Sequence, residues 1–208
     1  MHIKYEGSLS VVSGASRNGK SAYTMRELEN FEFALAWDVD EEYAGNGFVK
    51  ANGIADLINI IKQKGSKPLR VACVPKDLGE FDDFCKIALA WAKDIRDNKL
   101  GQLGVVVEET ADVTTPSKAP ANFRILIGRG MKLGISLFCV TQRPSESDKT
   151  SLGNAKNIIT FYMTRAADRD YMAREIGCDA SDIEELDKLH YLKKDVDNRK
   201  IVAGKLEF

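Results

Sequence analysis

The sequence lacks the long apolar segments that mark membrane proteins. Apolar runs such as 125–127 and 137–140 fall far short of the ~20 residues that a helix needs to cross a bilayer. The opening residues, MHIKYEGSLS, also lack the basic and then apolar build of a signal peptide. We therefore expect a soluble protein that stays in the compartment where it is made.

Cysteine and histidine are scarce as well. The four cysteines are scattered without any CxxC spacing, and only two histidines accompany them. This pattern argues against a disulfide framework and against a structural zinc site. Three of the four cysteines lie within apolar patterns, so we expect them to be small core residues in a reducing compartment.

Neither sign of charge dominates the chain. Thirty basic residues face 31 acidic ones, which gives a net charge of −1. A basic patch or stripe is the electrostatic footprint of a nucleic-acid-binding domain, and the overall charge provides no such excess. Any contact with DNA must therefore come from local loops or from the assembly of several copies.

The 208 residues, 44% of them hydrophobic, predict one α/β domain over 1–208 with a sizeable core. Strand-length apolar runs alternate with helical segments, which predicts a mostly parallel sheet flanked by helices. The expected strands are 9–12, a run ending at Trp37, 69–74, 103–107, 135–141 and 158–163. The expected helices are 21–30, 54–64, 81–97, 123–132, 166–176 and a short one near 183–189. Residues 145–156 are interpreted as a loop, and the C-terminal residues predict a β-hairpin that turns at Asp197 and Asn198.

The segment GASRNGKS lies between the first strand and a helix-compatible segment, where a phosphate-binding P-loop, or Walker A motif, belongs. Gly14 and Gly19 let the backbone curl around an anion, so that N–H groups and a helix N-terminus point at the phosphate. Lys20 reaches the β- and γ-phosphates, and the Ser21 hydroxyl is a ligand for Mg²⁺. A chance match would occur in roughly one chain in a hundred of this length. The predicted nucleoside triphosphate site comprises Gly14, Ala15, Ser16, Arg17, Asn18, Gly19, Lys20 and Ser21.

Polar side chains follow three of the expected strands. Glu108 and Glu109 end the run VVVEE, as in a Walker B motif, where one carboxylate holds the Mg²⁺ shell and the next orients or deprotonates water. Gln142 ends the following strand, and its amide can donate to the γ-phosphate and accept from the attacking water. Both sets are also compatible with ordinary polar strand ends. The acidic segment that begins at Asp38 is more often a solvated turn.

Three segments together resemble the FtsK/HerA superfamily of P-loop DNA-pumping ATPases. They are GASRNGKS, VVVEETAD and GRGMKLGISLFCVTQRPS, and the resemblance extends over residues 8–177. DVDEEY, with Asp38, Glu42 and Tyr43, is similar to the acidic motif that follows the second strand in that family. Glu108 stands where the family usually has Asp, and the chain is much shorter than a chromosome-segregation or conjugation motor.

The short length makes the chain resemble the minimal genome-packaging ATPases of membrane-containing icosahedral viruses, of the tectivirus and turrivirus kind. The resemblance implies a RecA-like (ASCE) fold, ATP hydrolysis with Mg²⁺ and translocation of double-stranded DNA into a capsid. It also implies a ring, commonly a hexamer, that meets capsid vertex proteins without spanning a membrane. The protein would then reside in the virion, at the packaging vertex, or in the host cytoplasm.

The same resemblance points to Arg129 as an arginine finger that acts on a neighbouring subunit, with Arg124 as the second choice. Arg143 and Arg165 are weaker candidates, and the alternative for Arg129 is a pairing with a carboxylate on the helix surface. Candidate DNA contacts lie in two loops, at Lys118, Arg143, Lys149 and Lys156.

Other functions stay open after this comparison. The sequence has no Asn-Lys-x-Asp motif of GTPases and no close match to the ABC signature, and a nucleotide kinase does not require VVVEE or TQRP. The remaining alternatives are another FtsK/HerA-type motor, for DNA transfer or phage extrusion, and a structural vertex protein that binds ATP without hydrolysing it.

Overall fold

A computed structural model describes residues 6–207 of the chain. The strands are β1 Leu9–Ser13, β2 Phe33–Trp37, β3 Val49–Asn52, β4 Leu69–Val74, β5 Leu103–Val107, β6 Ile135–Thr141, β7 Asn157–Phe161, β8 His190–Asp195 and β9 Lys200–Lys205. The α-helices are α1 Lys20–Leu28, α2 Ile54–Lys64, α3 Phe81–Asp97, α4 Thr110–Val113, α5 Ala121–Arg129, α6 Lys149–Asn154, α7 Ala166–Ile176 and α8 Ala180–Glu184. Short 3₁₀ turns occupy η1 Leu78–Glu80, η2 Gly130–Leu133 and η3 Pro144–Glu146.

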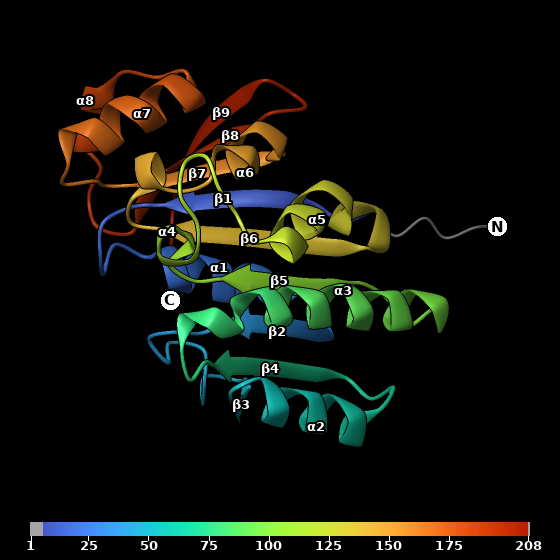
Figure 1. The fold of residues 1–208 in the computed structure, drawn as a ribbon. Helices are drawn as coiled ribbons and strands as arrows, with labels where there is room; N and C mark the ends of the chain where they lie inside the picture. Colours follow the sequence, from blue (N-terminus) through green and yellow to red (C-terminus); the bar gives the residue numbers. More distant parts are fainter. Residues whose placement is uncertain (1–5, 208) are drawn as a thin grey trace.

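Within residues 6–207, nine strands form one sheet in the order β3-β4-β2-β5-β6-β1-β7-β8-β9 (Figure 1). All neighbours from β3 to β7 pair in parallel. β8 pairs antiparallel with β7, and β9 pairs antiparallel with β8. The predicted fold class, a mostly parallel sheet flanked by helices with a C-terminal hairpin, is confirmed.

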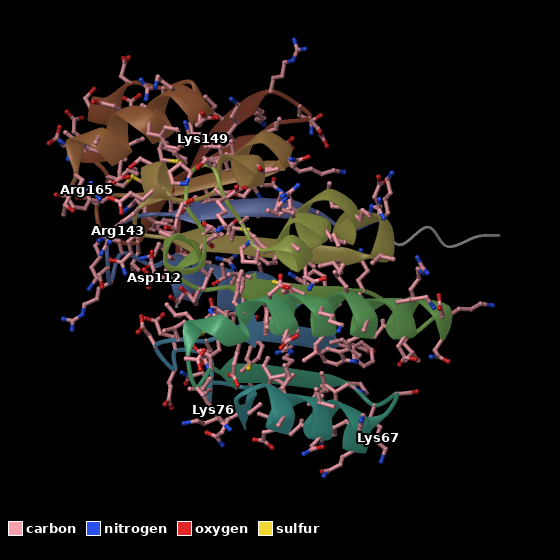
Figure 2. The ribbon with its side chains drawn as sticks, viewed as in Figure 1. Lys67, Lys76, Asp112, Arg143, Lys149 and Arg165 are labelled. Carbon is pink, nitrogen blue, oxygen red and sulfur yellow. The ribbon has the colours of Figure 1, made fainter. Side chains whose placement is uncertain are left out.

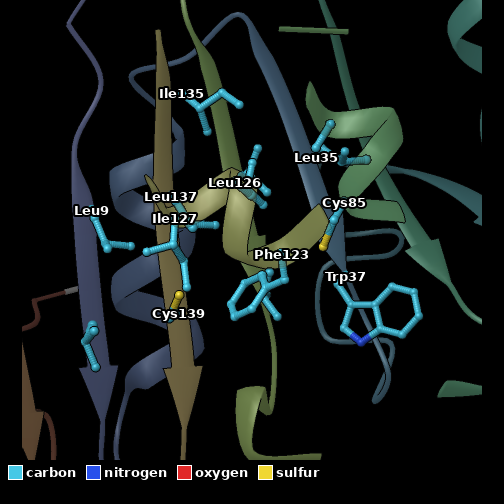
Figure 3. Close-up of a cluster of buried hydrophobic side chains, with 14 of the residues drawn as sticks. Leu9, Leu35, Trp37, Cys85, Phe123, Leu126, Ile127, Ile135, Leu137 and Cys139 are labelled. Atoms are coloured by element: carbon cyan, nitrogen blue, oxygen red, sulfur yellow. The ribbon is translucent and has the colours of Figure 1, made fainter. Parts of the chain in front are cut away.

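The core lies on both faces of this sheet. One face packs against α2, α3, α5 and α7, and the other packs mainly against α1, which lies behind the sheet in Figure 1. Figure 3 shows side chains of α5, including Phe123 and Leu126, facing buried residues of β6. All five residues of β5 are buried, which explains why its sequence is apolar throughout. The three cysteines expected in the core, Cys73, Cys85 and Cys139, are buried.

Two of the sequence interpretations are wrong. Residues 145–156 are not a simple loop, because they contain α6. Asp148 caps the N-terminus of this helix by accepting a hydrogen bond from the Thr150 amide (2.9 Å). The short helix expected near 183–189 lies earlier, at α8, where Asp179 and Asp182 form a capping box. The edge strand β3 was not predicted, since three of its four residues are exposed and it carries little apolar pattern.

The strand order gathers the predicted site at one edge. The P-loop strand β1 pairs with β6, and β6 pairs with β5. The P-loop, Gln142 and the Glu108–Glu109 pair therefore follow three neighbouring parallel strands, at the carboxyl ends where ligands bind in such sheets. No helix within residues 6–207 combines the length and apolarity required to cross a bilayer.

Candidate functional site

The P-loop is fixed to the sheet on both sides. The Gly14 amide donates to the carbonyl oxygen of Thr141 in β6 (3.3 Å), and the Ala15 amide donates to that of Tyr162, just after β7 (2.7 Å). A Cβ at Gly14 would lie 2.7 Å from the Cβ of Phe161, and the Gly14 φ is 153°. Glycine is therefore required at this position by both space and conformation.

The loop ends at the N-terminus of α1, which begins with Lys20. Gly19 precedes the helix with a φ of 113°, and a Cβ there would lie 3.0 Å from the Leu206 side chain. Lys20 is only 6% exposed, and its Nζ donates to the Ala15 carbonyl oxygen (3.1 Å). Burial lowers the pKa of Lys20, while the nearby carboxylates of Glu108 and Glu109 raise it. The ammonium group thus lies inside the loop that the sequence predicts to bind nucleotide phosphates.

Glu108 is a buried acid beside the start of α1. It is 8% exposed, and its Oε1 accepts a hydrogen bond from the Tyr43 hydroxyl (2.7 Å). Burial raises the pKa of Glu108 to about 7, and Glu42 adds to this rise, whereas Tyr43, Lys20 and Ser21 oppose it. Burial makes this carboxyl group costly to ionise in the protein without ligands. A cation bound next to it would favour the ionised form.

This buried acid predicts an unusual pH dependence of stability. Between pH 4.5 and about 7, the unfolded chain ionises Glu108 while the folded protein keeps the proton, so the free energy of unfolding falls as pH rises. Glu108→Gln should remove this loss and be more stable than the wild type at pH 8, by on the order of 1–3 kcal/mol. Urea unfolding at pH 5 and pH 8, without Mg²⁺ or nucleotide, measures the difference.

The exposed Glu41, which pairs with Lys50 (2.6 Å), supplies the control variant Glu41→Gln. An identical pH dependence for Glu108→Gln and the wild type would contradict the burial argument.

Glu109 is held next to the strand that ends in Gln142. Its backbone is left-handed, with a φ of 42°, and it precedes the short helix α4. Glu109 Oε1 accepts hydrogen bonds from the Thr141 hydroxyl (3.1 Å) and from the Gln142 backbone amide (3.0 Å). Gln142 itself is exposed. The structure therefore places Glu109 and Gln142 next to each other, joined through the Gln142 backbone amide rather than through the side-chain amide considered from sequence.

A cavity of about 280 Å³ brings the predicted residues together. It is lined by Ser16, Arg17, Gly19, Lys20, Ser21, Ala22, Asp40, Glu42, Glu108, Glu109, Gln142 and Leu189. Gly14, Ala15 and Asn18 shape the loop without lining this cavity. Leu189 was not predicted; it precedes β8, and only the return of the C-terminal hairpin to the P-loop places it at the site.

Arg129 lies away from the cavity of its own chain. It ends α5, and the next turn contacts the start of the sheet, where the Gly7 amide donates to the Met131 carbonyl oxygen (3.0 Å). Arg143 and Arg165 lie at the same end of the sheet as the P-loop (Figure 2). Arg165 pairs with Glu146 (2.6 Å). The structure thus separates the first-choice arginine from the site within one chain.

Asp38 is not part of a solvated turn, which corrects the interpretation of that segment. It is fully buried and accepts hydrogen bonds from the backbone amides of Glu42 (2.8 Å), Tyr43 (3.1 Å) and Ala44 (2.8 Å). Burial raises the pKa of Asp38, and the three amides oppose the rise. Asp40 and Glu42 of the same segment are exposed, as expected for a turn.

Comparison with known proteins gives one sequence relative and several similar folds. No family model matches the chain. Protein P9 of Pseudoalteromonas phage PM2 is 32% identical over 176 residues, which cover 80% of this chain and 77% of P9. The genome packaging NTPase B204 of Sulfolobus turreted icosahedral virus 2, solved with AMPPCP, has a TM-score of 0.76 at 20% identity, over 97% of this chain and 98% of that chain.

EssC (ATPases 2 and 3) of Geobacillus thermodenitrificans is a more distant fold relative. Its TM-score is 0.58 at 16% identity, over 96% of this chain and 39% of that chain. B204 has also been solved with ATP-gammaS, and that structure gives a TM-score of 0.77. These likenesses support the overall fold described above.

Proposed function

We propose that this chain, which belongs to the family of protein P9 of Pseudoalteromonas phage PM2, is a P-loop ATPase of the FtsK/HerA type. It would be an ATP-driven motor that translocates double-stranded DNA into a viral capsid. The observation that carries this proposal is the convergence of Lys20, Glu108, Glu109 and Gln142 on one cavity. The whole chain would act as a single ATPase domain. B204, which shares the fold, was solved with ATP analogues and is described as a genome packaging NTPase.

Residues of the P-loop would bind the nucleotide. The backbone amides before α1 surround the phosphates, and Lys20 balances the β- and γ-phosphate charge. The Ser21 hydroxyl and the Glu108 carboxylate line the same cavity and would hold Mg²⁺, which prefers oxygen ligands. When bound, Mg²⁺ neutralises phosphate charge that develops during transfer.

The acid and amide next to β6 would perform the hydrolysis. Glu109 accepts a proton from water as the water oxygen bonds to the γ-phosphorus, and the bond from phosphorus to the β-phosphate oxygen breaks to release ADP. Gln142 orients the same water and contacts the γ-phosphate. The hydrogen bond from the Gln142 backbone amide to Glu109 Oε1 holds the carboxylate next to the start of the Gln142 side chain.

Double-stranded DNA is the proposed cargo. Lys118, Arg143 and Lys149 are exposed, and Lys156 is partly exposed and lies near Asp197 (3.9 Å). With a net charge of −1, a single chain has no overall excess of positive charge, so a ring, commonly a hexamer, would gather these basic groups around the duplex. Capsid vertex proteins would hold this ring, in the virion or during assembly in the host cytoplasm.

Steady-state ATP turnover with and without double-stranded DNA tests this function. A motor is expected to hydrolyse ATP in the presence of Mg²⁺ and to be stimulated by DNA. The affinity for DNA should fall steeply with salt. A plot of the logarithm of the binding constant against the logarithm of the salt concentration should have a slope near −0.9 for each phosphate contacted. Negligible turnover in both conditions would favour a structural protein that binds ATP without using it.

We also propose that Arg129 acts as an arginine finger on the neighbouring subunit, since it lies away from its own cavity. Its guanidinium would stabilise charge on the γ-phosphate, an effect worth ~10³ to 10⁵ in rate. Arg129→Ala and Lys20→Ala should each be inactive alone, yet their mixture should recover hydrolysis at interfaces that combine an intact P-loop with an intact arginine. Radioactive phosphate release from mixed rings measures the recovery.

Arg124→Ala, on the same helix and also exposed, is the matched control for this mixing experiment. It should retain turnover as a homomer. Absence of recovery in rings shown to contain both subunits would eliminate Arg129. Arg124 would then be the finger if its own alanine variant loses turnover, and Arg143 and Arg165 would be tested next if it does not.

A further inference from the structure

The Tyr43 side chain connects three parts of the site that are distant in sequence. Tyr43 is fully buried, and its hydroxyl donates to Glu108 Oε1 (2.7 Å). The same hydroxyl contacts Thr24 Oγ1 on α1. Thr24 Oγ1 also lies within hydrogen-bond distance of the carbonyl oxygens of Lys20 (3.2 Å) and Ser21 (3.0 Å). A single phenol thus joins the Walker B acid to Thr24 of the P-loop helix.

Tyr43 is itself held from the opposite side. The Tyr43 backbone amide donates to Asp38 Oδ2 (3.1 Å). The Asp38 carboxylate also accepts hydrogen bonds from the amides of the neighbouring residues Glu42 and Ala44. The Tyr43 ring packs edge-on against Phe48, with ring centroids 5.6 Å apart. The turn after β2 therefore has little freedom, and the position of the hydroxyl is set by the fold rather than by Glu108.

We propose that Tyr43 is a positioning residue, which fixes the Glu108 carboxylate relative to Ser21. This inference rests on the proposed ATPase function. With Oε1 held by the phenol, Oε2 is the oxygen available to the Mg²⁺ shell. Without the hydroxyl, Glu108 can rotate, and the oxygen pair formed with Ser21 is no longer prearranged.

Tyr43→Phe removes the hydroxyl and keeps the ring that packs against Phe48. We expect kcat to fall about tenfold to a hundredfold, as for the loss of one hydrogen bond to a charged group. The Mg²⁺ concentration that half-saturates turnover should rise by a similar factor, while nucleotide affinity without Mg²⁺ stays unchanged. A variant that is merely less well folded would lower kcat without moving the Mg²⁺ midpoint.

Tyr23→Phe is the matched control. Tyr23 is also buried on this face, and its ring packs edge-on against Phe161 and Tyr191. Among residues 6–207, no hydrogen bond of its hydroxyl is found. Removal of the Tyr23 hydroxyl should therefore leave both kcat and the Mg²⁺ midpoint at the wild-type values.

Fluorescent ATP binding, titrated with Mg²⁺, provides a second readout that does not depend on turnover. If the wild type does not hydrolyse ATP but Tyr43→Phe still shifts this binding midpoint, the motor proposal fails and the positioning role stands. Unchanged midpoints in both binding and turnover would overturn the role of Tyr43. If Tyr43→Phe does not fold, Thr24→Val loosens the same hydroxyl and should shift the midpoint in the same direction.

Discussion

Glu109→Gln should bind ATP as tightly as the wild type and lose at least a hundredfold of its turnover. The amide retains the size of the side chain and can still accept the hydrogen bonds from Thr141 and the Gln142 backbone. It cannot take a proton from water, and general-base catalysis contributes typically 10²–10⁴ in rate. Binding of a fluorescent ATP analogue and steady-state phosphate release measure the two properties separately.

Two further variants sharpen the assignment of Glu109. Asp112→Asn makes the same acid-to-amide change at an exposed position of α4 and should leave turnover unchanged. Gln142→Ala keeps the backbone amide that Glu109 accepts, so it should reduce turnover less than Glu109→Gln does. Wild-type turnover in Glu109→Gln would show that another group activates the water.

Lys20→Ala is expected to weaken ATP binding by at least about a hundredfold. The ammonium group is almost fully buried, and Glu108 and Glu109 lie in the same cavity. Without its charge, the phosphates of ATP would face two carboxylates with only backbone amides to balance them, and hydrogen bonds of charged groups are worth about 1.5–3 kcal/mol each. Isothermal titration calorimetry with ATP and Mg²⁺ measures the loss.

Lys50→Ala serves as the control for Lys20→Ala, since Lys50 is exposed and pairs with Glu41 on the surface. Its removal should leave ATP affinity within the error of the measurement. An affinity of Lys20→Ala within threefold of the wild type would mean that the P-loop does not hold the phosphates through this residue.

The sequence was most informative where local chemistry decides the structure. Gly14, Gly19 and Lys20 lie within one short segment and together predict the P-loop. In the fold, neighbouring side chains would crowd a Cβ atom at either glycine. The run 103–107 is buried on both faces, so its apolar composition alone predicted a central strand. From these strands, the position of Glu108 and Glu109 opposite the P-loop followed directly.

Residues whose roles depend on distant contacts could not be assigned in the same way. Tyr43 and Glu108 are 65 positions apart, and nothing in the acidic turn indicates that its tyrosine points inward. The acidic run favours a surface position for Asp38 because a run of acids is usually solvated, whereas Asp38 accepts hydrogen bonds from three amides of its own turn. Leu189 reaches the cavity only because the hairpin folds back on the P-loop.

Displacement of a third DNA strand from a duplex tests translocation most directly. A triplex-forming oligonucleotide is placed on linear double-stranded DNA, and its release is followed after addition of the protein, ATP and Mg²⁺. Release is expected with ATP, none with AMPPCP, and none with the Glu109→Gln variant although that variant still binds ATP. ATP hydrolysis by the assembled protein without any release, or equal release with AMPPCP, would contradict ATP-driven translocation.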